Sequence, residues 1–449
     1  MAALAMGICL SSCTEKIELV YSDKAVTDVE LKAALEAKGV NFNEAGCILL
    51  DENAKAITEL DLSGKKVANF DGLEGLVNLT DLKLDGYGPI FDFSILPAQI
   101  TGVDLSNNEI VEYVNLVKAE IAENGDETIT NLRDLKKLYL PEVAKNNMTD
   151  LIRYYRQNKT AIENGDIDMQ MADAEGKLAK FNTLRVVPDP VMAAYLKSNF
   201  SSIFTDDKID LSKRLNSDQK TQRLLVNTYF VENFDKLANL DGLQYIVNNP
   251  SWEGTGITMM FPEPKDFPAI KVSKFVTSLY LTKLNVKDLD LSGAENLAKL
   301  NLNEIKGIES IDLRASKMWG EGTEGKGSSK LELYGCKDIK SVYFPEAKAL
   351  RANTVALEGL PLLATCDLTK FIMLSNLALG NLSASYNVVY PNITEFSKSE
   401  GSFNFACSKA VYALQATKDF IEKYKNYNGE RMIFRYDLSY DVNDTEFWR

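Results

Sequence analysis

Pairs of leucines separated by one residue recur at a regular distance near the start of the chain. Leu60 and Leu62 in "AITELDLSG" are followed by Leu82 and Leu84 in "LTDLKLDG", an offset of 22 residues (82 − 60). A strand places residues i and i+2 on one face, whereas no helix produces such a pair once in every 22 residues. The pattern predicts a short strand, a turn and a return segment that together form one repeated turn of the chain.

A third copy, "ITGVDLSNNEI", carries Val103 and Leu105 at an offset of 21 residues (103 − 82) and Asn108 three places after Leu105. This spacing resembles the leucine-rich repeat, LxxLxLxxNxL. The resemblance implies that the Asn108 side chain bonds to the backbone at the tight turn after the strand.

The signature returns after residue 270 with a shorter step. "VTSLYL", "VKDLDL", "LAKLNL" and "IESIDL" end at Leu281, Leu291, Leu302 and Leu313, so the steps are 10, 11 and 11 residues. Two such steps make one full repeat, and we therefore expect extended segments on both sides of each turn. "LELYGC", with Cys336 at the turn position, "SVYF", "TCDL" and "NLALGN" continue the pattern less regularly. This arrangement resembles the repeats of surface proteins from Bacteroides-type bacteria.

The segment before the repeats predicts a helical cap. "TDVELKAALEAKG" has Thr27 and Glu30 in capping-box spacing and Gly39 as a stop signal. The loop that follows, "NFNEAGCILLDE", partly matches a calcium-binding EF-hand loop, but Ala45 stands where a ligand oxygen is needed. We interpret it as a loop kept for its shape.

Between residues 141 and 256 the period is blurred. "MTDLIRYYRQNKTAIENG" and "SDQKTQRLLVNTYFVENFDKLANL" predict helices, the second with a buried stripe of Leu224, Leu225, Phe230 and Phe234. "KKLYLP" and "TLRVVP" beside them predict strands. The simplest account is that the repeated turns continue while their return segments lengthen into helices, and a separate helical domain is the alternative.

The C-terminal sequence "ATKDFIEKYKNYNGERMIFRYDLSY" predicts a helix, a turn at Asn428 and Gly429, and a final strand. A stack of repeats must cover its open end, so this segment is expected to be a cap.

Charge and composition exclude several functions. The chain has 449 residues, 64 acidic and 50 basic, and a formal net charge of −14, which argues against nucleic acid as a partner. It contains no histidine, so catalysis by Ser-His-Asp or Cys-His groups and metal binding by histidine are excluded. Paired carboxylate chemistry remains open, although composition identifies no pair. We expect no cofactor.

The first residues, "MAALAMGICLSSCTEK", form an apolar run followed by small residues and Cys13. Leu10-Ser11-Ser12-Cys13 resembles the bacterial lipobox, which implies cleavage before Cys13 and a lipid anchor on its sulfur at the outer membrane or cell surface. An apolar terminus without this role is the alternative. The other cysteines outside the signal, Cys47, Cys336, Cys366 and Cys407, form no CxxC pair, so we expect buried thiols and no metal site.

Two further motifs have competing interpretations. "GEGTEGKGSS", from Gly320, resembles a phosphate-binding P-loop, but Gly327 replaces the required Ser or Thr, so a flexible insertion is the better interpretation. Trp252 and Trp319 lie in glycine-containing loops, where each indole either stacks on a ligand or folds back to anchor its loop.

The residues between the paired apolar positions should face solvent. They are Asp61, Lys83, Asp104, Tyr139, Tyr280, Asp290, Asn301, Asp312, Glu332 and Tyr343. Each taken singly is most simply a solvated polar residue, but stacked turns would combine them into a surface suited to a large ligand. Tyr139, Tyr280, Tyr343, Asp290 and Asp312 are the candidates for ligand contact on this surface.

Together these patterns predict an α/β fold: a leucine-rich-repeat solenoid with a curved parallel sheet. The expected divisions are a lipoprotein signal peptide at 1–12, a helical cap at 13–56, repeats at 57–140, helix-rich irregular repeats at 141–256, repeats at 257–407 and a cap at 408–449. The favoured function is a non-enzymatic surface module that binds a protein or glycan. The alternatives are a glycan-processing enzyme with two carboxylates in the helical middle, and a structural spacer.

Overall fold

The computed structural model describes residues 19–122, 127–146, 150–319, 329–347, 349–382, 386–395, 402–425 and 431–435. The chain divides into two compact units, Met1–Asn182 and Thr183–Arg449, and this boundary falls inside the segment 141–256. Cys13 and the signal 1–12, the P-loop-like residues Gly320 to Gly327, and the turn at Asn428 and Gly429 lie outside the described residues.

The first unit is mainly short strands joined by turns and small helices. Its strands are β1 (Tyr21–Ala25), β2 (Cys47–Leu49), β3 (Glu59–Asp61), β4 (Asp81–Lys83), β5 (Ile90–Asp92), β6 (Gly102–Asp104), β7 (Glu112–Val114), β8 (Val117–Ile121), β9 (Glu127–Asn131), β10 (Lys137–Leu140), β11 (Asp168–Ala172) and β12 (Leu178–Lys180). Its α-helices are α1 (Val29–Ala37), α2 (Glu52–Ala56), α3 (Asp150–Gln157) and α4 (Lys159–Asn164), and its 3-10 turns are η1 (Leu73–Gly75), η2 (Phe93–Ile95) and η3 (Glu142–Asn146).

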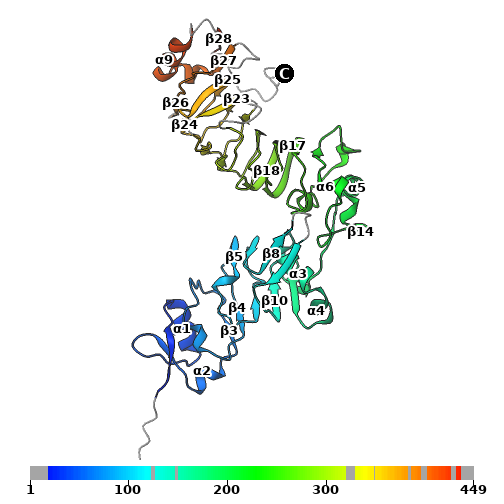
Figure 1. Cartoon of the computed structure of the whole chain (residues 1–449), viewed down its shortest axis with the longest axis vertical. Coiled ribbons are helices and arrows are strands. Elements are labelled where there is room, and N and C mark those ends of the chain that lie inside the picture. The colour runs from blue at the N-terminus through cyan, green and yellow to red at the C-terminus, as the bar shows by residue number, and fades with distance from the viewer. Residues whose placement is uncertain are drawn as a thin grey trace, which may run out of the picture. The chain divides into compact units, whose positions relative to one another are not determined.

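Within the described residues, six of these strands form one sheet in the order β12-β11-β10-β6-β4-β3, here named the N-terminal sheet (Figure 1). All neighbours in it are parallel except β11 and β12. Leu60, Leu82, Val103 and Leu138 lie in register across β3, β4, β6 and β10, and each is at most 2% exposed. The leucine pairs of the sequence are therefore one buried strand in each turn of the chain, as predicted.

Asn108 closes the turn after β6, which confirms its expected role. Its Nδ2 donates to the carbonyl oxygens of Leu84, at 2.8 Å, and Leu105, at 3.0 Å, and its Oδ1 accepts from the N–H of Tyr87 at 2.8 Å. The side chain is 8% exposed, so it satisfies buried backbone groups of two successive turns.

The N-terminal helix is present, but its cap differs from the prediction. α1 ends before Gly39, whose φ of +83° permits the stop. Its N-cap is Asp28 and not Thr27, because the Asp28 carboxylate accepts from the N–H groups of Leu31 and Ala68 and so ties the helix to the first repeat. The EF-hand-like loop is a tight turn in which Asn43 Oδ1 accepts from the N–H of Cys47.

The second unit begins with small elements and continues as a large sheet. Its strands are β13 (Leu184–Val186), β14 (Phe204–Thr205), β15 (Lys208–Asp210), β16 (Leu224–Val226), β17 (Gly256–Lys271), β18 (Ser278–Asp290), β19 (Lys299–Asn303), β20 (Ser310–Asp312), β21 (Lys330–Tyr334), β22 (Ser341–Tyr343), β23 (Leu350–Glu358), β24 (Thr365–Asp367), β25 (Phe371–Gly380), β26 (Asn387–Val389), β27 (Ser402–Cys407) and β28 (Arg431–Arg435). Its helices are α5 (Pro190–Asn199), η4 (Ser201–Ile203), α6 (Ser217–Lys220), η5 (Phe234–Lys236), α7 (Gln244–Val247), α8 (Lys409–Tyr412) and α9 (Gln415–Tyr424).

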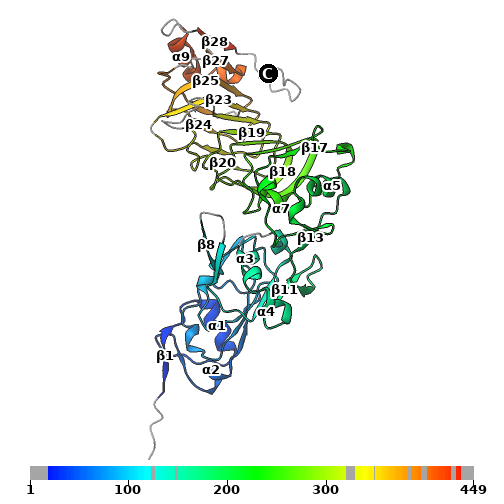
Figure 2. The same ribbon diagram turned by 45° about the vertical axis from the view of Figure 1, so that its right-hand side comes forward.

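Among the described residues, nine strands form a parallel sheet in the order β16-β17-β18-β19-β21-β23-β25-β27-β28, here named the C-terminal sheet (Figure 2). Leu279, Leu300, Leu331, Val355 and Leu377 lie in register in it and are at most 1% exposed. The other segments of these turns pair separately, as β20 with β22 and β24 with β26. Extended segments therefore lie on both sides of each turn, which confirms the interpretation of the 10- and 11-residue steps.

Residues in the left-handed region recur at the same place in successive turns, inside β18 and directly after β19, β21, β23 and β25. Lys283, Glu304, Gly335, Gly359 and Asn381 each stand two places after the second buried core residue of a strand, and their φ values lie between +48° and +67°. The N–H groups of Glu304, Gly335 and Gly359 each donate to a carbonyl of the next turn. The turn geometry therefore repeats although the residue type does not.

The predicted helix in "SDQKTQRLLVNTYFVENFDKLANL" is wrong. Only the four residues of α6 are α-helical there; Leu224 and Val226 are buried in strand β16, and Phe230 is 56% exposed. Polar residues interrupt the helix, because Asn227 Oδ1 accepts from the N–H of Tyr229 and Asn233 adopts a φ of +53°. The other middle helix is confirmed as α3 and α4, and "KKLYLP" and "TLRVVP" form β10 and β13.

The closing turn at Asn108 gives a stability prediction. Asn108→Ala removes three buried hydrogen bonds, so the free energy of unfolding of the first unit should fall by about 2–3 kcal/mol. Asn107→Ala is the matched control: this neighbour is exposed and should change stability by less than about 0.5 kcal/mol. Urea unfolding followed by circular dichroism, with hydrogen exchange of the amides near Leu84 and Leu105, measures both. Equal losses in the two variants would contradict this role for Asn108.

Candidate functional site

The two tryptophans are buried, so the interpretation of each as a loop anchor is confirmed and the alternative of a ligand contact is wrong. Trp252 is 1% exposed and its Nε1 donates to the Gln222 carbonyl oxygen at 3.0 Å. Trp319 is 0% exposed, and its Nε1 donates to the Leu297 carbonyl oxygen at 3.3 Å. Each indole anchors its own loop, because burying the ring and pairing its N–H leave no face for a ligand.

The aspartates at the ends of the repeat strands close turns. Asp290 Oδ1 accepts from the N–H of Ser292 at 2.8 Å, and Asp312 Oδ1 accepts from the N–H of Arg314 at 3.0 Å. The same bond recurs at Asp61, Asp104, Asp210 and Asp367. Asp290 and Asp312 therefore have a structural use that explains their presence without a ligand.

The predicted contact residues lie in different sheets of the two units. Tyr139 lies in the N-terminal sheet, Tyr280 in the C-terminal sheet, and Asp312 and Tyr343 are partners in the β20–β22 pair. Asp290 ends β18, where it pairs with Lys271. These positions therefore belong to different strand pairings.

Tyr139 takes part in a polar network on the N-terminal sheet. Its hydroxyl donates to Asp168 Oδ2 at 2.6 Å, and this bond, with a smaller effect of burial, raises the pKa of Tyr139 to about 12. Lys137 lies 5.1 Å from the Tyr139 ring centre and pairs with Asp81 at 3.2 Å. The network satisfies its own charges, so it offers few groups for a partner.

Tyr343 and Asp312 belong to a similar self-paired cluster. The Arg314 guanidinium contacts Asp312 at 2.6 Å and lies 5.1 Å from the Tyr343 ring centre. The ion pair is more than 40% exposed on both sides, so it contributes little to stability.

The face around Tyr280 is different. Residues of the C-terminal sheet that alternate with the buried leucines point to its outer side. Thr258, Tyr280, Asn301 and Glu332 lie in one row across β17, β18, β19 and β21, and Asn301 Nδ2 donates to Glu332 Oε2 at 2.9 Å. Burial raises the pKa of Tyr280, so its hydroxyl is a donor at neutral pH.

A second row beside it is basic. Gly256, Ser278, Lys299 and Lys330 are in register on the same four strands. Arg223, just before β16, lies against this row, because a Cβ added to Gly256 would be only 2.6 Å from Arg223 Nε. A glycine at position 256 therefore makes room for the guanidinium.

Exposed apolar groups lie at the other end of these strands. Tyr229 and Phe230, in the turn that directly follows β16, are 90% and 56% exposed, and Met260 on β17 is 46% exposed. Val226, the last residue of β16, pairs with Met259, so this turn lies beside Met260 at the sheet edge. We name the whole set the β16–β21 face: Arg223, Tyr229, Phe230, Thr258, Met260, Tyr280, Lys299, Asn301, Lys330 and Glu332.

Sequence reasoning found three members of this face, Tyr280, Asn301 and Glu332, and missed the aromatic and basic ones. Tyr229 and Phe230 were hidden by the expected helix. The only available signal for Lys299 and Lys330 is their position, one place before a core leucine of a repeat strand.

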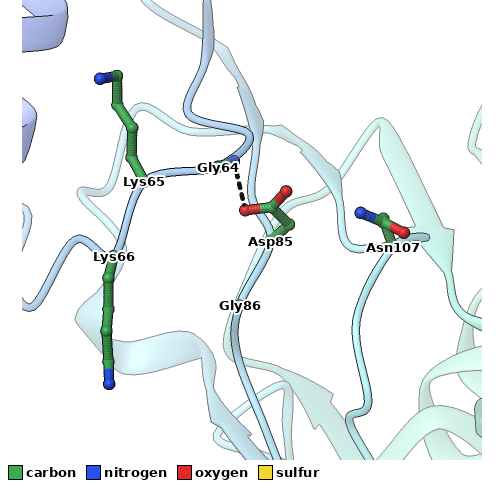
Figure 3. Close-up of a pocket in the computed structure, with 6 residues that line it drawn as sticks. All are labelled: Gly64, Lys65, Lys66, Asp85, Gly86 and Asn107. Carbon is green, nitrogen blue, oxygen red and sulfur yellow. Dashed lines mark hydrogen bonds between the residues drawn. The ribbon is translucent and has the colours of Figure 1, made fainter.

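A depression of about 370 Å³ in the first unit does not form a comparable site. It is lined by Gly64, Lys65, Lys66, Asp85, Gly86 and Asn107. In Figure 3 the two lysine side chains point in opposite directions, and the nearest carboxylate, Asp85, accepts from the N–H of Gly64 at 2.7 Å. These groups do not converge on one point.

Comparison with known proteins leaves the family open. No protein-family model matches the chain, and no curated protein matches it. A solved internalin from Listeria monocytogenes is similar over 82% of this chain and 96% of the internalin, with 15% identity and a TM-score of 0.20. A TM-score of that size carries no argument. In the described part of the chain, no helix has the length and apolar character needed to cross a membrane, and no three acidic or cysteine side chains are grouped to hold a metal.

Farther along the C-terminal sheet, Glu358 gives a pH prediction. It follows Tyr334 in register, is 5% exposed, and burial raises its pKa to about 7 from the ordinary 4.5. A carboxyl whose pKa is raised by folding stabilises the fold most below pH 4.5, and this stabilisation is lost as the pH rises through about 7.

Glu358→Gln removes the titrating carboxyl. The substitution should therefore be more stabilising at pH 8 than at pH 4, with a difference of up to about 3 kcal/mol in its effect on the free energy of unfolding. Urea unfolding of the second unit, which holds all three tryptophans, followed by tryptophan fluorescence, measures this difference. Glu263→Gln, at an exposed position of β17, should show no such pH dependence. A stability difference independent of pH would contradict the assignment.

Proposed function

We propose that the chain is a non-enzymatic recognition module of the leucine-rich-repeat solenoid type that binds a protein or glycan partner through the β16–β21 face. The observation that carries this proposal is the exposure of Tyr229, Phe230 and Met260 at one end of the strands whose other end carries the basic row. Exposed aromatic side chains next to polar groups are typical of binding surfaces, whereas a purely structural spacer has no use for them.

The repeat architecture supports the solenoid interpretation. Turns of about 22 residues, one buried strand in each, and the turn-closing Asn108 agree with the leucine-rich-repeat pattern. Rigid parallel strands hold the outward side chains at fixed positions, which lowers the entropy cost of binding a large partner.

The chain's expected place is the outer membrane or cell surface, held by a lipid on Cys13. The support for this is the Leu10-Ser11-Ser12-Cys13 sequence alone. Metabolic labelling with a palmitate analogue should mark the wild-type protein and not Cys13→Ser, and labelling of both would contradict a lipid anchor at Cys13.

A carboxylate-dependent enzyme has less support. In the middle segment, Asp189 accepts from the N–H groups of Val191, Met192 and Ala238. Asp210 accepts from the hydroxyls of Thr183 and Ser212. Both carboxylates hold backbone or turn structure, so neither is free to act as an acid, base or nucleophile.

A defined ligand screen tests the recognition role. The full chain is applied to a glycan array and to a panel of purified extracellular proteins, beside the double variant Tyr229→Ser and Phe230→Ser. Loss of two exposed rings from an interface should lower the affinity for a genuine ligand at least about tenfold. The matched control is Tyr343→Ser with Leu362→Ser, which removes two residues of 45% and 50% exposure elsewhere in the second unit.

A ligand that binds the control and not the aromatic variant supports the β16–β21 face. A ligand weakened equally by both double variants would move the site elsewhere. Absence of any ligand would favour the spacer, and release of reducing sugar from a bound glycan would favour the enzyme.

A further inference from the structure

The basic row of the β16–β21 face contains Lys299 and Lys330, and Arg223 lies against Gly256 in the same row. Lys299 and Lys330 occupy adjacent parallel strands in register, so their backbones are about 4.8 Å apart. Within the described residues, Lys299, Lys330 and Arg223 form no ion pair with an acidic side chain. Like charges side by side on a sheet repel each other.

This arrangement is unexpected in so acidic a chain. With 64 acidic residues against 50 basic ones, carboxylates are abundant. Elsewhere in the same unit they pair with lysines, as Glu253 does with Lys220 and Glu295 with Lys317. Glu332, the acidic neighbour within the face, is 9% exposed and accepts from Asn301. An external anion would relieve the repulsion between the lysines.

We propose that Arg223, Lys299 and Lys330 bind the carboxylates of a linear uronic-acid polysaccharide, with Tyr280 and Asn301 contacting its sugar rings and hydroxyls. The proposal rests on the recognition role of the β16–β21 face and names the ligand chemistry. The row runs across the strands from β17 to β21, so a linear chain lying along it meets Arg223 at Gly256, then Ser278, and then Lys299 and Lys330. Asn301 and Tyr280 stand two residues farther along β19 and β18, on the same side of the sheet.

The hydrogen-bonding groups around the row favour a sugar over a peptide. Thr258, Tyr280 and Asn301 supply hydroxyl and amide groups that match sugar hydroxyls. An extended peptide gains its main-chain hydrogen bonds at a sheet edge, and the backbone groups of β18 and β19 are already used by their neighbours. Nucleic acid is disfavoured by the net charge of −14.

The experiment measures binding of the full chain to polygalacturonate by calorimetry. Wild type should bind, and Lys299→Gln with Lys330→Gln should weaken binding at least about tenfold, the effect expected from losing one charge-assisted contact. Lys299→Arg with Lys330→Arg should retain binding. The matched control is Lys208→Gln with Lys287→Gln, which removes two exposed lysines outside the face and should change the affinity less than about twofold.

Three further probes separate the possible ligands. Carboxyl-reduced polygalacturonate, which keeps the sugar and lacks the charge, should not bind. Polyglutamate, which keeps the carboxylates and lacks the sugar, should bind at least about tenfold more weakly than polygalacturonate. Tyr280→Ala should weaken the binding of polygalacturonate. The salt dependence of the affinity should stay unchanged, because the tyrosine ring carries no charge.

Several results would overturn the proposal. These are equal affinity for polyglutamate and polygalacturonate, equal losses in the two lysine-to-glutamine double variants, and no binding of polygalacturonate by wild type. In the last case, a different ligand that is lost with Tyr229→Ser and Phe230→Ser would leave the recognition role standing while the uronate ligand fails.

Discussion

The fold depends on two apolar side chains in each turn that lie in register with the two of the turn before. In the N-terminal sheet these are the rows that contain Leu60 and Leu62, and in the C-terminal sheet the rows that contain Leu279 and Leu281. A slip of one residue would move every such pair to the solvent side, so the register is strongly specified. The same alternation directs Tyr280, Asn301 and Lys299 outward, and the recognition face is a consequence of the core.

Stacking strands in this way requires that every turn be closed in the same manner, and the chain uses side chains to do it. Asn108 bonds three backbone groups, and aspartates such as Asp290 and Asp312 accept from the N–H two residues later. After four strands of the C-terminal sheet, and inside β18 at Lys283, a residue in the left-handed region turns the chain, whether it is glycine, lysine, glutamate or asparagine. Polar residues at regular spacing in such a fold are therefore first explained by turn closure.

These constraints determine what could be predicted from the sequence. The strands, their parallel stacking, the two-sided turns after residue 270 and the role of Asn108 all follow from local spacing. The burial of Trp252 and Trp319 does not, because a loop tryptophan has the same sequence signal whether it folds inward or outward. The segment after α6 has the sequence signal of a helix, because Leu224, Leu225 and Phe230 fit a helical period over a few residues. The pairing of β16 with β17, a long-range contact, decided otherwise. The basic row does not follow from the sequence for the same reason, since only the stacking of turns places Arg223 against Gly256, in the row of Lys299.

The acidic surroundings of Arg223, Lys299 and Lys330 affect which anionic ligands these cations can bind. A net charge of −14 repels a polyanion at a distance, but salt reduces this repulsion beyond about 8 Å at physiological ionic strength. Lys299 and Lys330 act within that distance, at contact. A ligand recognised there gains little from long-range attraction and depends on how well its carboxylates and hydroxyls match the side chains of the sheet. Such a surface discriminates by spacing more than by charge density, because each added charge that finds no cation on the row is repelled by the rest of the molecule.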